Sequence, residues 1–439
     1  MGLSVPKYYK NERKEKIKLS ILFIGAFLLV FIIGGYLFNH FRNIEEQKAE
    51  GIFTICNLDY KDTLALIHKD EYEHVYEISD YLYYGENLNL FNKPYDITKR
   101  DDIIGRTLIL TNMCTKAEMV YLIDGNIDNQ IPIEVLEDGF YSVKIVYDLT
   151  QRSAYSETKI DDIYYTVRRN GESKQIRLIA DAEFFSNDQQ QESLDRNYLF
   201  IEVKSETVPD TIYDIVIDPG HSSKDTGNYV EYGGRANGLL EADETYKLAM
   251  VIKDELESYG LKVLVTRSDP TEVVDTYGED GRLDRAYKAK AKYYIDLQMR
   301  VASNPNIEGT QIVHSSFTSS KMANAIYSYL LDNTDLVSTG YRGSGRIPGV
   351  IASGKINGYD GRMVIRESGG RLLAAGTFSD LAQELNASFA KDERYGIQAF
   401  TIEYIYISNP TEVEKWKASY QDYGIKTAEG IALYLNIID

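Results

Sequence analysis

An uncharged stretch near the start of the chain restricts its folding more than any other feature. Leu19–Phe38 contains no charged residue. As a helix rising about 1.5 Å per residue, it is long enough to cross a hydrocarbon core of about 30 Å. Basic residues before the span favour a cytoplasmic N-terminus, so residues 1–18 are predicted to stay inside and the rest to lie outside. These basic residues are Lys7, Lys10, Arg13, Lys14, Lys16 and Lys18.

A cleaved signal peptide is the alternative interpretation of this stretch. It requires a shorter apolar region and a cleavage site with small residues two positions apart. Gly34-Gly35-Tyr36-Leu37 is a poor site of that kind. We therefore expect an uncleaved single-pass membrane anchor at residues 19–38, a short polar linker at residues 39–50, and extracellular domains after it.

Composition and charge set broad limits on the rest of the chain. With 439 residues, of which 44% are hydrophobic, two or three folded domains are expected. The net charge of -19 argues against nucleic acid as a partner, because phosphate binding needs concentrated Lys and Arg. Cys56 and Cys114 lack the spacing of a structural zinc site, and the sequence leaves open one disulfide or two buried thiols.

Residues 51–204 show the alternation of apolar and polar residues that is typical of strands. The segments 164–169 and 173–180 flank Asn170-Gly171, a turn pair that predicts a β-hairpin. Residues 198–204 alternate again. Several short strands at this spacing predict an immunoglobulin-like β-sandwich. No group of titratable residues here has catalytic spacing, so we expect a spacer or a module that binds a protein partner.

After a predicted linker at residues 205–213, the pattern changes to alternating strands and helices. Ile215-Val216-Ile217 is a short apolar run that suits a buried strand. Residues 241–259 have helical periodicity and end before Gly260, where a C-terminal glycine is favoured. Residues 214–439 are therefore predicted to form an α/β domain with a mainly parallel sheet flanked by helices. Further strands are expected at 261–266, 293–297, 309–314 and 399–402, and further helices at 282–292 and 320–331.

Three titratable residues fall where such a sheet binds its ligands. His221 follows the first strand in Asp218-Pro219-Gly220-His221, Glu241 opens the first helix, and Glu403 ends a late strand. Open α/β sheets bind ligands at the carboxyl ends of their strands. The spacing alone leaves a metal site, an acid–base site and a structural role open.

Five ordered motifs resemble those of the zinc-dependent N-acetylmuramoyl-L-alanine amidases of the sporulation-amidase type. They are IVIDPGH, GLLEADE, LKVLVTRSD, RLDRAYKAKAKYYIDLQ and FTIEYIYISNP, and the resemblance extends over nearly all of residues 214–439. The resemblance implies a mainly parallel sheet, a Zn²⁺ cofactor with His221 and Glu241 as ligands, and Glu403 as the catalytic carboxylate. It also implies peptidoglycan as the substrate, cleaved between N-acetylmuramic acid and L-alanine.

One position departs from the family pattern. An ungapped alignment places Gln298 where the family has its second histidine ligand. A glutamine oxygen is a weaker donor to zinc than imidazole. Three explanations remain: a weakened but working site in which Gln298 or water fills the position, replacement of the ligand by His314, or a catalytically impaired pseudo-amidase that binds peptidoglycan or acts as a scaffold.

The connection before the late strand is unusually long and rich in glycine. About seventy residues separate Leu331 from that strand, more than such connections usually contain. A surface hairpin is one interpretation. The other is a lid whose Arg366 or Arg371 binds a stem-peptide carboxylate, since guanidinium suits bidentate carboxylate recognition.

Overall fold

The computed structural model describes residues 74–92, 101–169, 172–184, 194–207, 211–224, 227–343, 347–356, 359–368 and 394–439. All of them belong to one compact unit, Leu64–Asp439. The predicted anchor at residues 19–38, its two flanks and the first residues of the β region lie outside the described part. Within that part, no helix is both long and apolar enough to cross a membrane.

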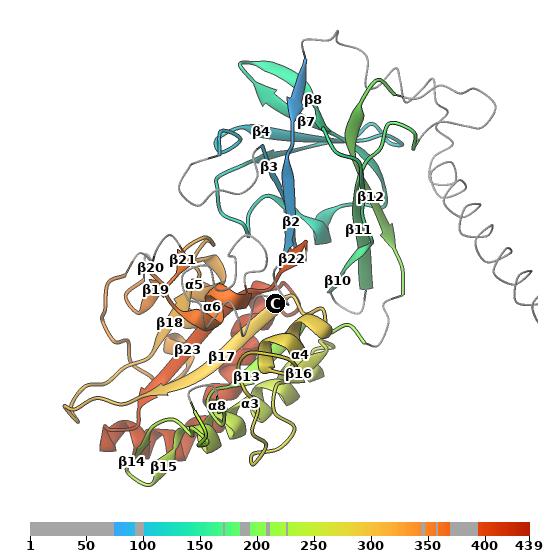
Figure 1. The fold of residues 1–439 in the computed structure, drawn as a ribbon. Helices are drawn as coiled ribbons and strands as arrows, with labels where there is room; N and C mark the ends of the chain where they lie inside the picture. Colours follow the sequence, from blue (N-terminus) through green and yellow to red (C-terminus); the bar gives the residue numbers. More distant parts are fainter. Residues whose placement is uncertain are drawn as a thin grey trace, which may run out of the picture. The chain divides into compact units, whose positions relative to one another are not determined.

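The first half of the described chain is built from β-strands (Figure 1). One sheet has the order β10-β11-β12-β8-β7-β4-β5, with β1 beside β8 and β9 beside β11, and a second sheet has the order β22-β2-β3-β6. The strands of this half are β1 Val75–Glu77, β2 Asp80–Tyr84, β3 Asn87–Phe91, β4 Thr107–Asn112, β5 Glu118–Leu122, β6 Ile131–Pro132, β7 Gly139–Tyr147, β8 Thr150–Ser156, β9 Ile160–Asp161, β10 Tyr165–Arg169, β11 Glu172–Ala180 and β12 Asn197–Ser205, with the 3₁₀ helix η1 Ile133–Val135.

These two sheets share one hydrophobic core, as the predicted sandwich requires. Leu88 of one sheet and Leu108 and Ile201 of the other are fully buried in the same cluster. The predicted hairpin is confirmed, because β10 pairs antiparallel with β11 and Arg169 faces Glu172. Immunoglobulin-like topology remains a prediction. Cys114 is disulfide-bonded.

The second half forms the predicted α/β arrangement. Its six-stranded sheet has the order β16-β13-β17-β23-β18-β19. The first four strands are parallel, whereas β18 runs antiparallel to β23 and β19 runs parallel to β18. The elements are β13 Ile215–Pro219, β14 Arg235–Ala236, β15 Leu239–Leu240, α3 Glu241–Ser258, β16 Val263–Val265, α4 Arg282–Lys288, β17 Tyr293–Arg300, β18 Gln311–His314, α5 Lys321–Asn333, β19 Val350–Ala352, β20 Lys355–Ile356, β21 Tyr359–Asp360, α6 Met363–Ser368, β22 Tyr395–Gly396, β23 Gln398–Tyr406 and α8 Pro410–Tyr434.

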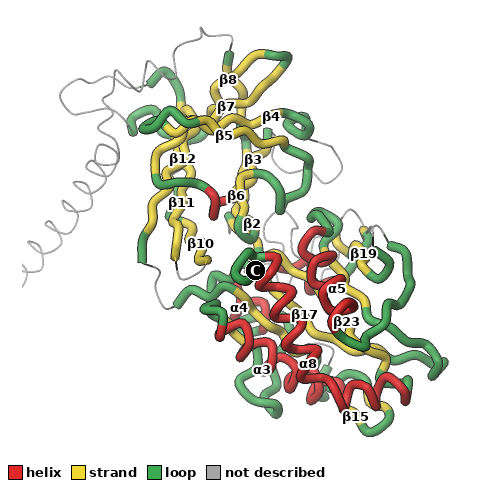
Figure 2. The backbone as a smooth tube through the Cα atoms, turned by 180° about the vertical axis from the view of Figure 1, so that it is seen from behind, coloured by secondary structure: helices red, strands yellow, loops and turns green. Residues whose placement is uncertain are grey.

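Helices cover both faces of this sheet. Helices α3, α5 and α8 lie together on one face, the side toward the viewer in Figure 2. Leu248, Ile326 and Trp416 from these three helices share a buried cluster with Ile217 of β13. On the opposite face, α4 and α6 pack against the alternate side chains of the same strands in a second buried cluster. The mainly parallel, helix-flanked sheet is thus confirmed.

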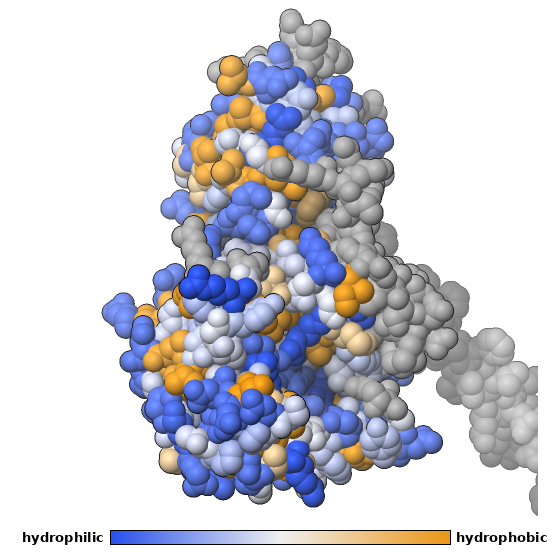
Figure 3. All heavy atoms as spheres, turned by 90° about the vertical axis from the view of Figure 1, so that its left-hand side faces the viewer, coloured by the Kyte–Doolittle hydropathy of each residue, from blue (hydrophilic) through white to orange (hydrophobic). Residues whose placement is uncertain are grey.

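Element boundaries differ from the predictions where local conformation intervenes. Helix α4 ends at Lys288 rather than Lys292, and Lys290 takes a left-handed φ of 51°. The long glycine-rich connection contains β19, the antiparallel hairpin of β20 and β21, and helix α6. Its last strand, β22, pairs with β2. On the face shown in Figure 3, hydrophobic residues are interspersed among hydrophilic ones.

The N-terminus of α8 offers a test of this fold away from the sheet edge. The Asn409 side chain accepts hydrogen bonds from the backbone N–H groups of Thr411 and Glu412, and Pro410 begins the helix. We expect Asn409→Ala to lower the free energy of unfolding by about 1 kcal/mol, whereas Asn409→Ser keeps a capping oxygen and most of the stability. Denaturant unfolding followed by Trp416 fluorescence measures this, since Trp416 is the chain's one tryptophan and is fully buried. Equal losses in both variants would contradict the capping role.

Candidate active site

A tight turn after β13 presents His221 at the carboxyl end of the sheet. His221 and Ser222 both have left-handed φ values, 69° and 61°. Gly220 allows close approach of the neighbouring strand, because a Cβ there would lie 2.3 Å from Nε2 of Gln298. Local strain of this kind persists where the surrounding structure enforces it, and it is common at functional sites.

The imidazole of His221 lies between two carboxylates. Its Nε2 is 2.9 Å from Oε1 of Glu241, and its Nδ1 is 2.7 Å from Oε2 of Glu231. Backbone N–H groups hold the Glu241 carboxylate in place, with Met299 donating to Oε1 at 2.6 Å and Gly234 donating to Oε2 at 2.8 Å. Glu231 in turn accepts from the N–H of Gly233 at 2.6 Å. The histidine is therefore oriented at both nitrogens by anchored carboxylates.

These contacts determine the protonation of His221. Burial lowers its pKa, but Glu241 and Glu231 outweigh burial and raise the pKa to about 9. The imidazole is thus protonated at neutral pH in the metal-free protein and donates at both nitrogens. Because the folded-state pKa lies above the ordinary value of 6.5, the associated stability is present below pH 6.5 and is lost as the pH rises through 9.

Gln298 and Asp296 lie on the adjoining strand β17. Nε2 of Gln298 donates to Oδ1 of Asp296 at 2.8 Å, and the hydroxyl of Thr401 donates to Oδ2 of Asp296 at 2.8 Å. Burial, with a smaller contribution from the Asp218 carboxylate, raises the pKa of Asp296 to about 6. The side chain at the expected third ligand position is therefore a neutral amide whose N–H₂ group is engaged by a carboxylate.

Glu403 is surrounded by donors. Gln311 Nε2 donates to its Oε2 at 2.5 Å, and Nε of Arg300 is 3.4 Å from the same oxygen. Nη2 of Arg362 forms an ion pair with Oε1. The side chain is only 10% exposed. Glu403 is thus a nearly buried carboxylate held by two guanidinium groups.

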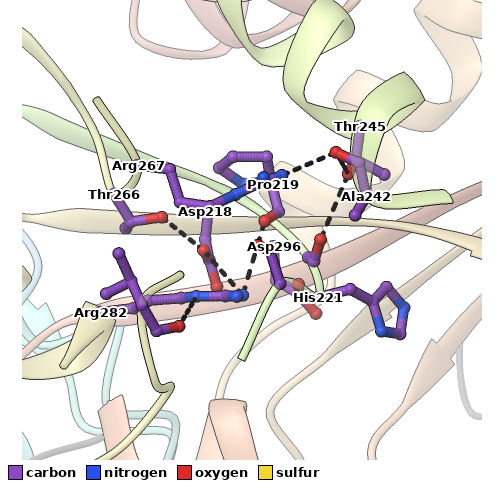
Figure 4. Close-up of polar contacts among 12 residues, drawn as sticks. Asp218, Pro219, His221, Ala242, Thr245, Thr266, Arg267, Arg282 and Asp296 are labelled. Atoms are coloured by element: carbon purple, nitrogen blue, oxygen red, sulfur yellow. Dashed lines mark hydrogen bonds and ion pairs between the residues drawn. The ribbon is translucent and has the colours of Figure 1, made fainter. Parts of the chain in front are cut away.

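A buried polar cluster supports the turn from behind (Figure 4). Asp218 accepts from the hydroxyls of Thr266 at 2.6 Å and Tyr294 at 2.5 Å, and it lies 3.4 Å from Nη1 of Arg282. In the figure, the His221 ring points away from this cluster. These contacts fix the end of β13 and leave the imidazole directed toward the edge.

The structure brings together four of the predicted site residues. Gln298 of β17 pairs with Glu403 of β23, while His221 and Glu241 lie beside the Gly220 turn that packs on Gln298. Sequence reasoning missed Glu231, Asp296, Arg300 and Arg362. Asp296 had a signal, since it lies two residues before Gln298 and so on the same face of a strand. The others lie in loops or depend on a strand bulge, and the sequence carried no comparable signal for them.

Three other candidates lie elsewhere. His314 is on the antiparallel strand β18, where Gln311 pairs with Glu403 and His314 pairs with Phe400, three residues further from the edge. Its Nδ1 contacts the carbonyl of Ser315 at 2.8 Å, and its position beside Phe400 rather than Glu403 does not support replacement of Gln298 as a ligand. Arg366 is fully buried in an ion pair with Glu367, which does not support its predicted role in binding a surface ligand. Arg371 lies outside the described residues.

Comparison with known protein families matches residues 215–435 to the N-acetylmuramoyl-L-alanine amidase family. The chain belongs to this family. No curated protein matches the chain. Among solved structures, the amidase AmiC2 of Nostoc punctiforme is 17% identical, covering 52% of this chain and 97% of its own, with a TM-score of 0.34. The catalytic domain of the amidase CwlV from Bacillus (Paenibacillus) polymyxa var. colistinus is 17% identical, covering 52% and 100%, with a TM-score of 0.34. Ami1 from Mycobacterium smegmatis is 18% identical, covering 52% and 99%, with a TM-score of 0.35.

Amidases of this family are generally zinc-dependent, so the donors can be tested against that ion. His221 Nε2 and Glu241 Oε1 converge to 2.9 Å and are donors that zinc accepts. Within the described part of the chain, no group of three or more His, Cys, Asp and Glu side chains is arranged to hold a metal. The amidase site therefore fits zinc at two protein positions, and at the third it offers only the neutral amide of Gln298.

The contact between Glu231 and His221 predicts a measurable shift. In metal-free protein we expect Glu231→Gln to lower the pKa of His221 from about 9, because one of the two carboxylates that raise it is removed. An NMR titration of the histidine rings with a chelator present measures this, with Asp195→Asn in the β region as the control. A wild-type His221 that titrates near its ordinary value of 6.5 would contradict the geometry.

Proposed function

We propose that this amidase-family protein hydrolyses the amide bond between N-acetylmuramic acid and the L-alanine of peptidoglycan stem peptides. The observation that carries the proposal is the His221–Glu241 pair, 2.9 Å apart, at the strand edge of a domain that matches the amidase family over residues 215–435. In this reaction water adds its oxygen to the carbonyl carbon, the C–N bond breaks, and the alanine nitrogen takes a proton.

We propose that His221, Glu241 and Gln298 hold a Zn²⁺ ion. When bound, zinc would supply Lewis-acid polarisation of the scissile carbonyl. Glu231 orients the imidazole through Nδ1, as carboxylates commonly do for metal-binding histidines. The proton on Nε2 of His221 must leave before a metal binds, so we expect the affinity for zinc to rise with pH.

Glu403 is proposed as the group that moves the proton. An ionised carboxylate offers about four acceptor positions, and Gln311 and Arg362 donate hydrogen bonds to two of them. The remaining acceptor capacity can serve the attacking water, from which Glu403 takes a proton and then returns it to the leaving amine.

The location is proposed from the sequence. An anchor at residues 19–38 with a cytoplasmic N-terminus places the amidase domain outside the membrane, where peptidoglycan lies. The disulfide bond of Cys114 supports an oxidising compartment. The β region would then set the reach of the amidase domain or bind a protein partner.

A second candidate is a pseudo-amidase that binds peptidoglycan, or acts as a scaffold, without cleaving it. The neutral amide at position 298 and the two cations on Glu403 favour it, because both changes weaken the expected chemistry. Two measurements on the full-length chain separate the candidates: zinc per chain, and release of stem peptides from sacculi. Zinc near one per chain with release supports the amidase, whereas binding to sacculi without zinc or release supports the pseudo-amidase.

The proposed role of Glu403 predicts a loss of activity without a loss of metal. We expect Glu403→Gln to leave zinc content near that of the wild type and to lower amide cleavage by about two orders of magnitude or more, the size expected for a lost general base. Metal analysis and a peptide-release assay on the same preparation test it. A fall in zinc content would make Glu403 a ligand and contradict this role.

The neutral amide at the third ligand position predicts that a histidine there increases the affinity for zinc. We expect Gln298→His to raise the affinity for zinc, because an imidazole nitrogen replaces a weak neutral oxygen donor. Competition with a chelator measures the change, and Gln151→His, which places the same imidazole at an exposed position of β8 away from the site, serves as the control. Equal zinc retention in wild type and Gln298→His would show that position 298 is not at the metal.

A further inference from the structure

Arg362 connects the long glycine-rich segment to the candidate active site. It lies between β21 and α6, and its Nη2 forms the ion pair with Oε1 of Glu403, while its Nη1 is 4.0 Å from Oδ2 of Asp296. The side chain is 30% exposed. The guanidinium group therefore contacts the proposed proton carrier and also remains open to solvent.

A second arginine lies on the other side of the same carboxylate. Nε of Arg300 is 3.4 Å from Oε2 of Glu403, and its guanidinium lies 4.2 Å above the Tyr406 ring. Nη1 of Arg300 is buried and has no hydrogen-bond partner among the described residues. A buried guanidinium N–H without an acceptor costs free energy. Arg300 therefore has a donor available for a second carboxylate beside Glu403, the carboxylate that it shares with Arg362.

The position of Arg362 is fixed by its backbone. Its N–H donates to Oγ of Ser353 at 2.8 Å. Asp360, two residues before Arg362, is fully buried, and its carboxylate accepts hydrogen bonds from the hydroxyls of Ser315 and Ser316, each at 2.6 Å. This anchoring holds the guanidinium over the strand ends in the absence of a ligand, as a preorganised receptor requires.

Exposure separates this pair from three buried arginines of the same domain. Arg267 and Arg282 are 1% exposed and Arg366 is 0% exposed, and their contacts hold loops and strand ends together. Arg300 and Arg362 are 26% and 30% exposed at the edge where ligands of such sheets bind.

We propose that Arg362, with Arg300, is a carboxylate receptor for the peptide ligand, and that Glu403 occupies it when no ligand is bound. A carboxylate of the incoming peptide displaces Glu403 from the Arg362 fork, since guanidinium binds carboxylates bidentately. Ligand binding and release of Glu403 are thereby coupled. The ligand class, a stem peptide with free carboxylates, rests on the proposed function.

If a ligand carboxylate competes with Glu403 for Arg362, the affinity for a peptide depends on whether its carboxylates are free. Calorimetric titration of the full-length chain, with a chelator present to prevent cleavage, would compare two probes. One is an N-acetylmuramoyl-L-alanine peptide that ends in free carboxylates, and the other is the same peptide with those groups amidated. We expect wild type to prefer the free acid by about tenfold or more, the size of one charge-assisted hydrogen bond.

Three variants distinguish a receptor from a structural ion pair. Arg362→Gln removes the preference for the free acid, and Glu403→Gln tightens binding of the free acid several-fold because the internal competitor is gone. Arg196→Gln, a partly exposed arginine that pairs with Asp195 in the β region, leaves both affinities unchanged. Should Arg362→Gln unfold, Arg362→Gln/Glu403→Gln, which removes both charges, is expected to show the same lost preference.

The outcomes separate this proposal from the proposed amidase activity. Preference retained in Arg362→Gln, no tightening in Glu403→Gln, or no binding of either peptide would overturn the receptor. Peptide release is assayed separately with zinc present. A chain that shows the carboxylate preference but cleaves nothing would support the receptor and contradict the amidase.

Discussion

Parallel hydrogen bonding between β13, β17 and β23 is the constraint on which the candidate site depends. It aligns Pro219 with Leu297 and Gln298 with Glu403, so the end of β13 lies in one row with positions near the ends of β17 and β23. The side chains that follow or end these strands then converge although they are far apart in sequence. Helix α3 adds Glu241 at the same edge, where its carboxylate is held by backbone N–H groups of Gly234, in a loop, and of Met299, in β17.

The balance of charges at this edge of the sheet then determines which ligands it can bind. Carboxylates from Glu231, Glu241, Asp296 and Glu403 gather within a partly buried region, and such groups are stable there only with protons, cations or donors nearby. In the metal-free chain the balance comes from protonated His221 and from Arg300 and Arg362. A zinc ion would take the place of the His221 proton, and a peptide carboxylate would take the place of Glu403 on Arg362.

Much of this domain could be predicted from sequence because its signals are local. The buried run before Pro219 and the helix that ends before Gly260 follow from periodicity and turn residues, and the structure confirms them. The late strand is also present, but it was predicted to end before Glu403 and instead continues through Glu403 to Tyr406. The position of Gln298 followed from the ordered motifs. The carboxylate on Nδ1 of His221 and the guanidinium on Glu403 could not be predicted in this way. They come from Glu231 and Arg362, loop residues whose partners are set by tertiary contacts rather than by spacing. For the same reason the sequence pattern pointed to Arg366 in the glycine-rich segment, whereas the structure buries Arg366 and leaves Arg362 partly exposed.

The proposed zinc site has His221 and Glu241 as ligands and a third protein ligand that is not a histidine. X-ray absorption at the zinc edge of the zinc-loaded full-length chain identifies these ligands. A first shell of nitrogen and oxygen at about 2.0–2.1 Å with scattering from a single imidazole is expected. A shell with two imidazoles, or one with water oxygens and no imidazole, would contradict it.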